Sequence, residues 1–150
     1  MYQHLTLLGA YLTWIVLFIL LGGLVLGQLV VGFWRLPRFY LLFGIAFFAY
    51  AAGWIAAYFS LRGPAGEWVG SLGGSVLMGA VFAIGFRAAR DVVKLSALVF
   101  AGNSIGYFLG SGLNDYVGGR VGMLLWGIAY GLCLGGGLGA VLHLAQPRRA

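Results

Sequence analysis

The sequence predicts an all-α membrane protein, a bundle of five transmembrane helices packed through glycine zippers. Of its 150 residues, 62% are hydrophobic and only 8% are charged, whereas about a quarter of the residues of a soluble domain are charged. The mean hydropathy is +0.99, and the apolar residues form long runs. The chain contains 27 glycines, several of them spaced four residues apart. A chain of this length predicts a single integral membrane domain over residues 1–150.

The first predicted span covers residues 5–32 and is longer than a vertical crossing requires. A hydrocarbon core of about 30 Å needs about 20 helical residues at 1.5 Å each. The span contains Gly22, Gly23 and Gly27, followed by Gln28, so we expect it to tilt or bend. A bend beside Gln28 would open a polar cavity, as unwound segments do in transporters. The simpler interpretation is a tilted helix whose glycines pack against a neighbouring helix.

Four further spans are predicted at residues 39–60, 68–86, 92–112 and 121–144. Short connections that contain Arg, Pro, Gly or Asp separate them, so we expect tight hairpins. The last two spans carry glycines at every fourth position, which places each set on one helix face. In lipid, helix association depends on close backbone approach, which such ridges allow. The sequence therefore predicts helix-packing ridges at Gly102, Gly106 and Gly110, and at Gly127, Gly131, Gly135 and Gly139.

The basic residues predict the orientation of the bundle, because loops rich in Lys and Arg are retained in the cytoplasm. One side holds only Arg62 and Arg120. The other side holds Arg35, Arg38, Arg87, Arg90, Lys94, Arg148 and Arg149. We therefore expect the N-terminus outside and the C-terminus in the cytoplasm of a bacterial-type inner membrane, with the first span retained rather than cleaved. This topology explains the net charge of +6 without a nucleic-acid partner.

A polar stripe marks the fourth span, where Asn103, Tyr107 and Ser111 follow one another at intervals of four. An amide near the middle of a span must face another helix or water. Its expected partners at similar depth are Ser75, Tyr50 and Tyr130. One interpretation is a path for a small polar solute or ion, with Arg62, Glu67, Asp115 and Arg120 at an outer mouth. The simpler interpretation is interhelical hydrogen bonding, at about 0.6 kcal/mol per bond.

Catalytic and cofactor chemistry is weakly represented. His4 and His143 fall on opposite sides of the membrane, so they cannot together hold one haem within a protomer. Either imidazole could ligate a pigment or metal alone, although an interfacial histidine is commonly an ordinary end residue. Cys133 has no second cysteine to pair with and is expected to pack. No acid lies within a span, which disfavours a proton or sodium relay. We predict no cofactor and no enzyme.

The expected role is therefore one of interaction, as a non-enzymatic accessory, stabilising or assembly subunit of a larger membrane complex. The connections are short, reactive groups are absent, and the glycine ridges exceed what one short bundle has to bury. The expected partners are lipid and other membrane subunits or a second copy of the chain. The alternative is a small homo-oligomeric channel or transporter for a polar solute or ion. A third interpretation is an accessory protein that holds pigment or quinone between its helices.

Overall fold

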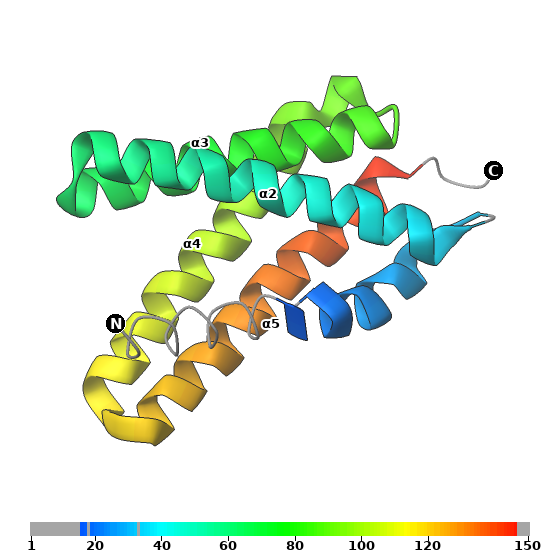
Figure 1. Ribbon diagram of the computed structural model, residues 1–150. Helices are drawn as coiled ribbons and strands as arrows, with labels where there is room; N and C mark the ends of the chain where they lie inside the picture. Colours follow the sequence, from blue (N-terminus) through cyan, green and yellow to red (C-terminus); the bar gives the residue numbers. More distant parts are fainter. Residues whose placement is uncertain (1–15, 18, 33, 147–150) are drawn as a thin grey trace, which may run out of the picture.

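The computed structural model describes residues 16–146 except 18 and 33, and within them it contains helices but no strand (Figure 1). The long helices are α2 (Arg35–Leu61), α3 (Gly63–Gly85), α4 (Val92–Val117) and α5 (Gly119–Ala145). Two short 3-10 turns, η1 (Gly27–Leu29) and η2 (Ala89–Asp91), precede α2 and α4. The four long helices are long and apolar enough to cross a membrane. The predicted all-α, membrane-type fold is confirmed.

The first of the five predicted spans is only partly described, because residues 5–15 and 18 lie outside the described residues. A shorter apolar helix covers Ile19–Leu29, and the chain becomes extended at Val30. A fifth span therefore stays a prediction. Gly27 packs closely against α2, since a Cβ atom placed on it would lie 2.7 Å from Cδ2 of Leu36. Such packing is what the tilted-helix interpretation expects of the glycines in this segment.

The helices begin earlier or end later than the predicted spans because proline and glycine occupy permissive positions at their ends. α2 includes Pro37 and α3 includes Pro64 within the first turn, where a missing N–H removes no helical hydrogen bond. Gly118 and Gly119 connect α4 to α5 with φ values of 70° and 59°, which glycine adopts without steric cost. The connections are as short as the sequence predicts.

The four helices form two antiparallel hairpins, α2–α3 and α4–α5, which converge at one end and diverge at the other (Figure 1). The contact between the hairpins is made mainly by α3 against α4. The buried core lies at the converging end, where α2 and α4 begin and α3 and α5 end. Its most deeply buried side chains, each less than 2% exposed, include Phe39, Phe43, Phe82, Leu95, Val99, Leu138, Val141 and Leu142.

Polar side chains also tie the converging end together. Arg38 donates from Nη2 to the carbonyl oxygen of Gly85 at 2.9 Å, and its guanidinium lies 5.1 Å from the centre of the Phe86 ring. Gln146 donates to the carbonyl of Leu29 at 2.9 Å and accepts from the amide of Val31 at 2.6 Å. These contacts join α2 to α3 and fasten the chain before α2 to the end of α5.

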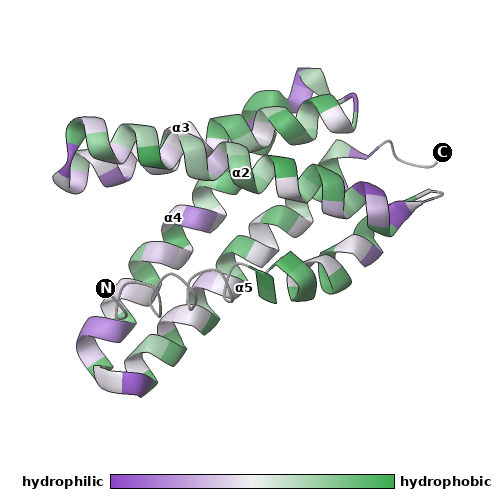
Figure 2. Ribbon diagram, in the orientation of Figure 1, coloured by the Kyte–Doolittle hydropathy of each residue, from purple (hydrophilic) through white to green (hydrophobic). Residues whose placement is uncertain are grey.

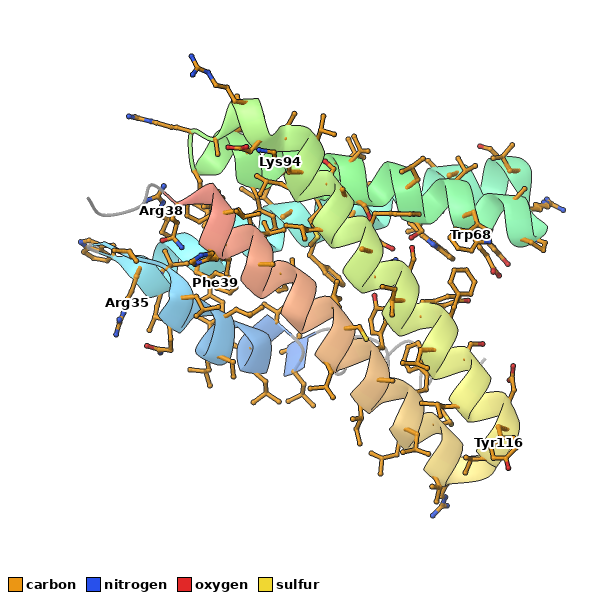
Figure 3. The ribbon with its side chains drawn as sticks, turned by 180° about the vertical axis from the view of Figure 1, so that it is seen from behind. Arg35, Arg38, Phe39, Trp68, Lys94 and Tyr116 are labelled. Carbon is orange, nitrogen blue, oxygen red and sulfur yellow. The ribbon has the colours of Figure 1, made fainter. Side chains whose placement is uncertain are left out.

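The charged and apolar residues are distributed as a membrane requires. Hydrophilic residues gather mainly at the helix ends and connections, and apolar residues dominate between them (Figure 2). Arg35, Arg38 and Lys94 lie at the converging end, whereas Trp68 and Tyr116 lie at the diverging end (Figure 3). The orientation prediction assigns the first end to the cytoplasm, and that assignment stays a prediction.

The glycine ridges pack differently from the expected pattern. The α4 ridge lies against the backbone of α5: Cβ atoms placed on Gly102, Gly106 and Gly110 would lie 2.8–3.1 Å from carbonyl oxygens of that helix. The glycine that meets this ridge from α5 is Gly137, whose Cβ would lie 3.2 Å from the Cα of Gly102. The ridge predicted on α5 does not form this contact. No described atom of another segment comes within 4 Å of a Cβ placed on Gly127, Gly131 or Gly135. A Cβ placed on Gly139 would lie 3.7 Å from Cδ1 of Leu29.

A further glycine ridge, absent from the prediction, joins α3 to α2. Gly66, Gly70 and Gly74 also recur every four residues. Cβ atoms placed on them would lie 2.8–3.2 Å from the carbonyl oxygens of Tyr58, Trp54 and Tyr50, respectively. In each hairpin, a glycine ridge on α3 or α4 therefore lies against a tryptophan and at least one tyrosine of the other helix.

Candidate functional site

A cavity of about 210 Å³ lies between the two hairpins and is lined by all four long helices. Its lining residues belong to the middle or later parts of α2 and α4 and to the earlier parts of α3 and α5, and these parts lie toward the end where the hairpins diverge (Figure 1). Its walls combine aromatic rings with a few polar side chains and one carboxylate. The lining residues are Tyr50, Trp54, Glu67, Ser71, Asn103, Ser104, Tyr107, Phe108, Trp126 and Tyr130.

A chain of hydrogen bonds runs along one wall of the cavity, centred on the buried side chain of Asn103. Its Nδ2 donates to Oγ of Ser71 at 2.8 Å, and its Oδ1 accepts from the hydroxyl of Tyr130 at 2.9 Å. The hydroxyls of Ser71 and Ser104 lie 2.9 Å apart and share a hydrogen bond. The chain links α3, α4 and α5. It meets the demand that polar groups at membrane depth find partners.

The glycine ridges position the two tryptophans of the cavity. The indole Cδ1 of Trp54 would lie 3.0 Å from a Cβ on Gly70, and that of Trp126 would lie 2.8 Å from a Cβ on Gly110. Because glycine has no side chain, each indole can lie directly against the neighbouring helix. In both hairpins the tryptophan lies nearer the diverging end than the tyrosine that also lines the cavity.

Ring stacking holds these aromatic side chains in place. Trp54 stacks on Tyr58 with ring centres 4.8 Å apart and an interplanar angle of 9°. Trp126 stacks on Tyr130 at 5.3 Å and 10°. Offset stacks of this kind stabilise both ring positions beyond the burial of their area. The aromatic walls are therefore ordered by their own contacts.

Glu67 supplies the negative charge of the cavity. It lies near the start of α3, is partly exposed, and precedes Trp68, whose ring stacks on Phe108 at 4.4 Å. Within the described part of the chain, no Lys or Arg lines the cavity, and Glu67 has no ion-pair partner within 4 Å. Among the described residues, the cavity thus presents a carboxylate without an ion pair.

Most of the predicted polar residues meet at this cavity. Asn103, Tyr107, Tyr50 and Tyr130 line it, but Ser111 does not. Ser75 is fully buried elsewhere, and its hydroxyl has no hydrogen-bond partner among the described residues. The expected mouth residues Arg62, Asp115 and Arg120 are exposed and line no part of the cavity.

Sequence reasoning missed the serines and tryptophans of the cavity. Ser71 lies one helical turn before Ser75, so the spacing predicts the polar face of this span. The structure places Ser71, and not the predicted Ser75, in the cavity wall. Trp54 and Trp126 were recognisable as partners of Tyr58 and Tyr130 at a spacing of four residues, which places them on one helix face. Only the crossing of the two hairpins brings these faces together.

Of the two candidate ligands for a cofactor, the described one, His143, lines no part of the cavity. His143 lies exposed in the last turn of α5, and His4 lies outside the described residues. Within the described ranges, no three His, Cys, Asp or Glu side chains come together in a geometry for a metal ion. Cys133 is partly buried, and its Cβ would lie 3.0 Å from one placed on Gly106.

Comparison of the chain with known protein families, with curated proteins and with solved structures finds no match. The function of this chain is therefore not inferred from the activity of a relative. What the protein does has to be inferred from the cavity between the hairpins and from the outer faces of the helices.

Proposed function

We propose that this chain is a small non-enzymatic membrane protein that receives a small polar solute in the cavity between its hairpins, as a channel or transporter. The observation that supports the proposal is the cavity itself, to which all four long helices contribute. Ligand sites in helical bundles are commonly built between helices, from mostly apolar walls and a few oriented polar groups.

The polar groups of the cavity exceed what helix packing alone requires. Asn103 already has partners for both ends of its amide. Tyr50, Tyr107 and Glu67 add further polar atoms to the same cavity. At membrane depth, ionisable and polar side chains typically mark a solute path or a watery cavity. We therefore infer that Asn103 both joins the helices and forms part of the wall of a solute path.

The first test is whether water reaches the cavity in the membrane. In a Cys133→Ala background, Tyr107→Cys places a thiol in the cavity wall. Leu109→Cys places one on the same helix, at a position 50% exposed outside the cavity, where lipid surrounds it. We expect a membrane-impermeant thiol reagent to label the Tyr107→Cys variant at least about tenfold faster. Equal labelling of the two variants would rule out a water-accessible cavity.

The second test is flux through purified protein in liposomes. Uptake of radiolabelled small cations and neutral solutes is compared between the wild type and the Asn103→Leu variant. Lost uptake by a variant that assembles normally supports a path along Asn103. Failed assembly supports a packing role for Asn103 alone, and a wild type that moves no solute argues against transport.

A second candidate function, an accessory subunit of a larger complex, is favoured by the outer face of α5. No described atom comes within 4 Å of a Cβ placed on Gly127, Gly131 or Gly135. This ridge would allow close approach of a neighbouring helix. Purification from native membranes in mild detergent, with mass spectrometry and an absorption scan, tests for stoichiometric subunits, pigment or quinone. A colourless protein without companions would exclude this role, and Gly131→Leu should release a genuine partner.

A further inference from the structure

We infer that the solute held in this cavity is a small organic cation, a quaternary ammonium or protonated amine bound between the indoles of Trp54 and Trp126 and the carboxylate of Glu67. The inference rests on the proposed function, since it names the chemistry of the solute that the cavity receives. It specifies the charge of that solute, which follows from the residues that line the cavity, and its compact size, which follows from the cavity volume.

The aromatic walls favour a positive ligand. Six of the ten lining residues are aromatic, and two of them are tryptophans. The face of an aromatic ring carries negative potential, and tryptophan attracts cations most strongly. The stacks of Trp54 on Tyr58 and of Trp126 on Tyr130 fix both indoles before a ligand arrives. Little side-chain ordering is then required on binding.

The charge of the lining residues also favours a positively charged ligand. Among the residues that the structure describes, Glu67 is the one acidic residue that lines the cavity, and no basic residue does. An anion would meet this carboxylate without a basic partner among the lining residues, so the lining disfavours it. In the described part of the chain, no ion pair of Glu67 would have to break before a cation enters.

The ligand set distinguishes an organic cation from a metal ion. Calcium requires six to eight oxygen ligands, and magnesium retains its waters unless it meets several oxygens. The cavity offers a single carboxylate, and the described residues contain no metal-binding group of three. Alkyl groups on nitrogen spread the positive charge and match apolar walls. An alkylated ammonium therefore fits this lining where a hard metal ion does not.

The volume of the cavity, which is partly open, suits a compact ligand. At about 210 Å³, the cavity is smaller than the roughly 300–1,000 Å³ of pockets that enclose drug-sized molecules. A neutral polar solute would depend on hydrogen bonds alone; the Asn103 amide is already engaged by Ser71 and Tyr130, which leaves mainly the hydroxyls of Tyr50 and Tyr107 as neutral polar groups. A compact cation, held by charge and ring faces, requires fewer such bonds.

Choline and 3,3-dimethylbutan-1-ol form a matched pair of probes, because the second replaces the charged nitrogen of the first with neutral carbon. Calorimetric titration of the full chain in maltoside detergent should give choline an affinity at least about tenfold higher. Glu67→Gln should lower choline affinity by about tenfold without affecting the neutral probe. The matched control is Asp115→Asn, which removes an exposed charge that lines no part of the cavity and should leave affinity unchanged.

The outcomes separate this inference from the proposal on which it rests. Equal binding of the two probes, or no binding of choline while Tyr107→Cys remains reactive, overturns the organic-cation inference and leaves a solute cavity in place. An unreactive Tyr107→Cys overturns both. If Glu67→Gln fails to fold, the comparison of the two probes on the wild type still decides.

Lipid headgroups could supply the same chemistry as a soluble amine, and a change of membrane distinguishes the two sources. Choline affinity is measured in nanodiscs of phosphatidylcholine and of phosphatidylglycerol. Weaker apparent binding in phosphatidylcholine identifies the headgroup as a competing ligand. Equal binding in both assigns the cavity to a soluble cation.

Discussion

Asn103 lies where three helices meet, and its side chain bonds to two of them. Replacing it by leucine removes the donor to Ser71 and the acceptor of Tyr130. Interhelical hydrogen bonds in membranes contribute about 0.6 kcal/mol each, so we expect Asn103→Leu to lower stability by roughly 1 kcal/mol. Unfolding in mixed micelles measures this loss. The control Ser111→Ala, which removes no hydrogen bond of the network, should leave stability unchanged, and an equal loss in both variants would contradict the assignment.

The position of Asn103 within an apolar run can be read from the sequence, whereas the choice of its hydrogen-bond partners depends on how the helices pack. An amide among apolar residues is conspicuous in the sequence and predicts a buried hydrogen bond. Which serine it meets depends on the rotation and crossing of α3 against α4. Ser71 and Ser75 are one turn apart on that helix, so spacing could not choose between them. Glu67 was expected at an outer mouth, but its aromatic surroundings come from helices far apart in the sequence.

The single side chain of Gln146 joins the segment before α2 to the end of α5. Its amide makes hydrogen bonds to Leu29 and Val31, and Gln146→Leu removes both. We expect faster hydrogen exchange at the Val31 amide, with exchange in the middle of α4 and α5 unchanged. Gln28→Leu is the matched control, since Gln28 is exposed. Comparable exchange at Val31 in both variants would contradict the role given to Gln146.

At the scale of the elements, the two glycine ridges of the α4–α5 hairpin make opposite predictions. A Cβ on Gly106 would lie 3.0 Å from the Cβ of Cys133 and 3.1 Å from the backbone of Tyr130. Gly106→Ala should therefore force the helices apart and cost roughly 1–3 kcal/mol. Gly131→Ala meets no described atom within 4 Å and should change stability by less than about 1 kcal/mol. Paired unfolding measurements test this, and equal losses would place Gly131 in a tight contact.

The helices, their ends and their packing faces could be predicted from the sequence to different degrees. Long apolar runs predicted four of the observed helices, and Pro and Gly predicted the turns between them. The helix ends were less certain, because Pro37 and Pro64 were read as interruptions although both lie in the first turn of a helix. The packing face of α5 could not be predicted, because its glycines occupy more than one face, and only the contact with Gly102 identifies Gly137 as the glycine that meets the α4 ridge.

At the scale of the whole molecule, the distribution of charge predicts which end faces the cytoplasm. Arg90 lies in η2, directly before α4 begins at the converging end, and Tyr116, which is 91% exposed, lies at the diverging end (Figure 3). In a Cys133→Ala background, an impermeant maleimide should label Tyr116→Cys from outside intact cells. It should label Arg90→Cys only in inverted vesicles. The reverse pattern would invert the predicted topology and place the cavity on the cytoplasmic side.

The divergence of the two hairpins also affects the surrounding bilayer. A body that is narrow at one end and wide at the other displaces unequal areas of lipid from the two leaflets. In the leaflet at the diverging end the body narrows toward the bilayer midplane, which leaves space that lipids with broad tails and small headgroups fill well. Lateral pressure at the two membrane depths therefore acts on the angle between the hairpins. Lipid shape therefore acts on the width of the cavity, whether or not a headgroup enters it.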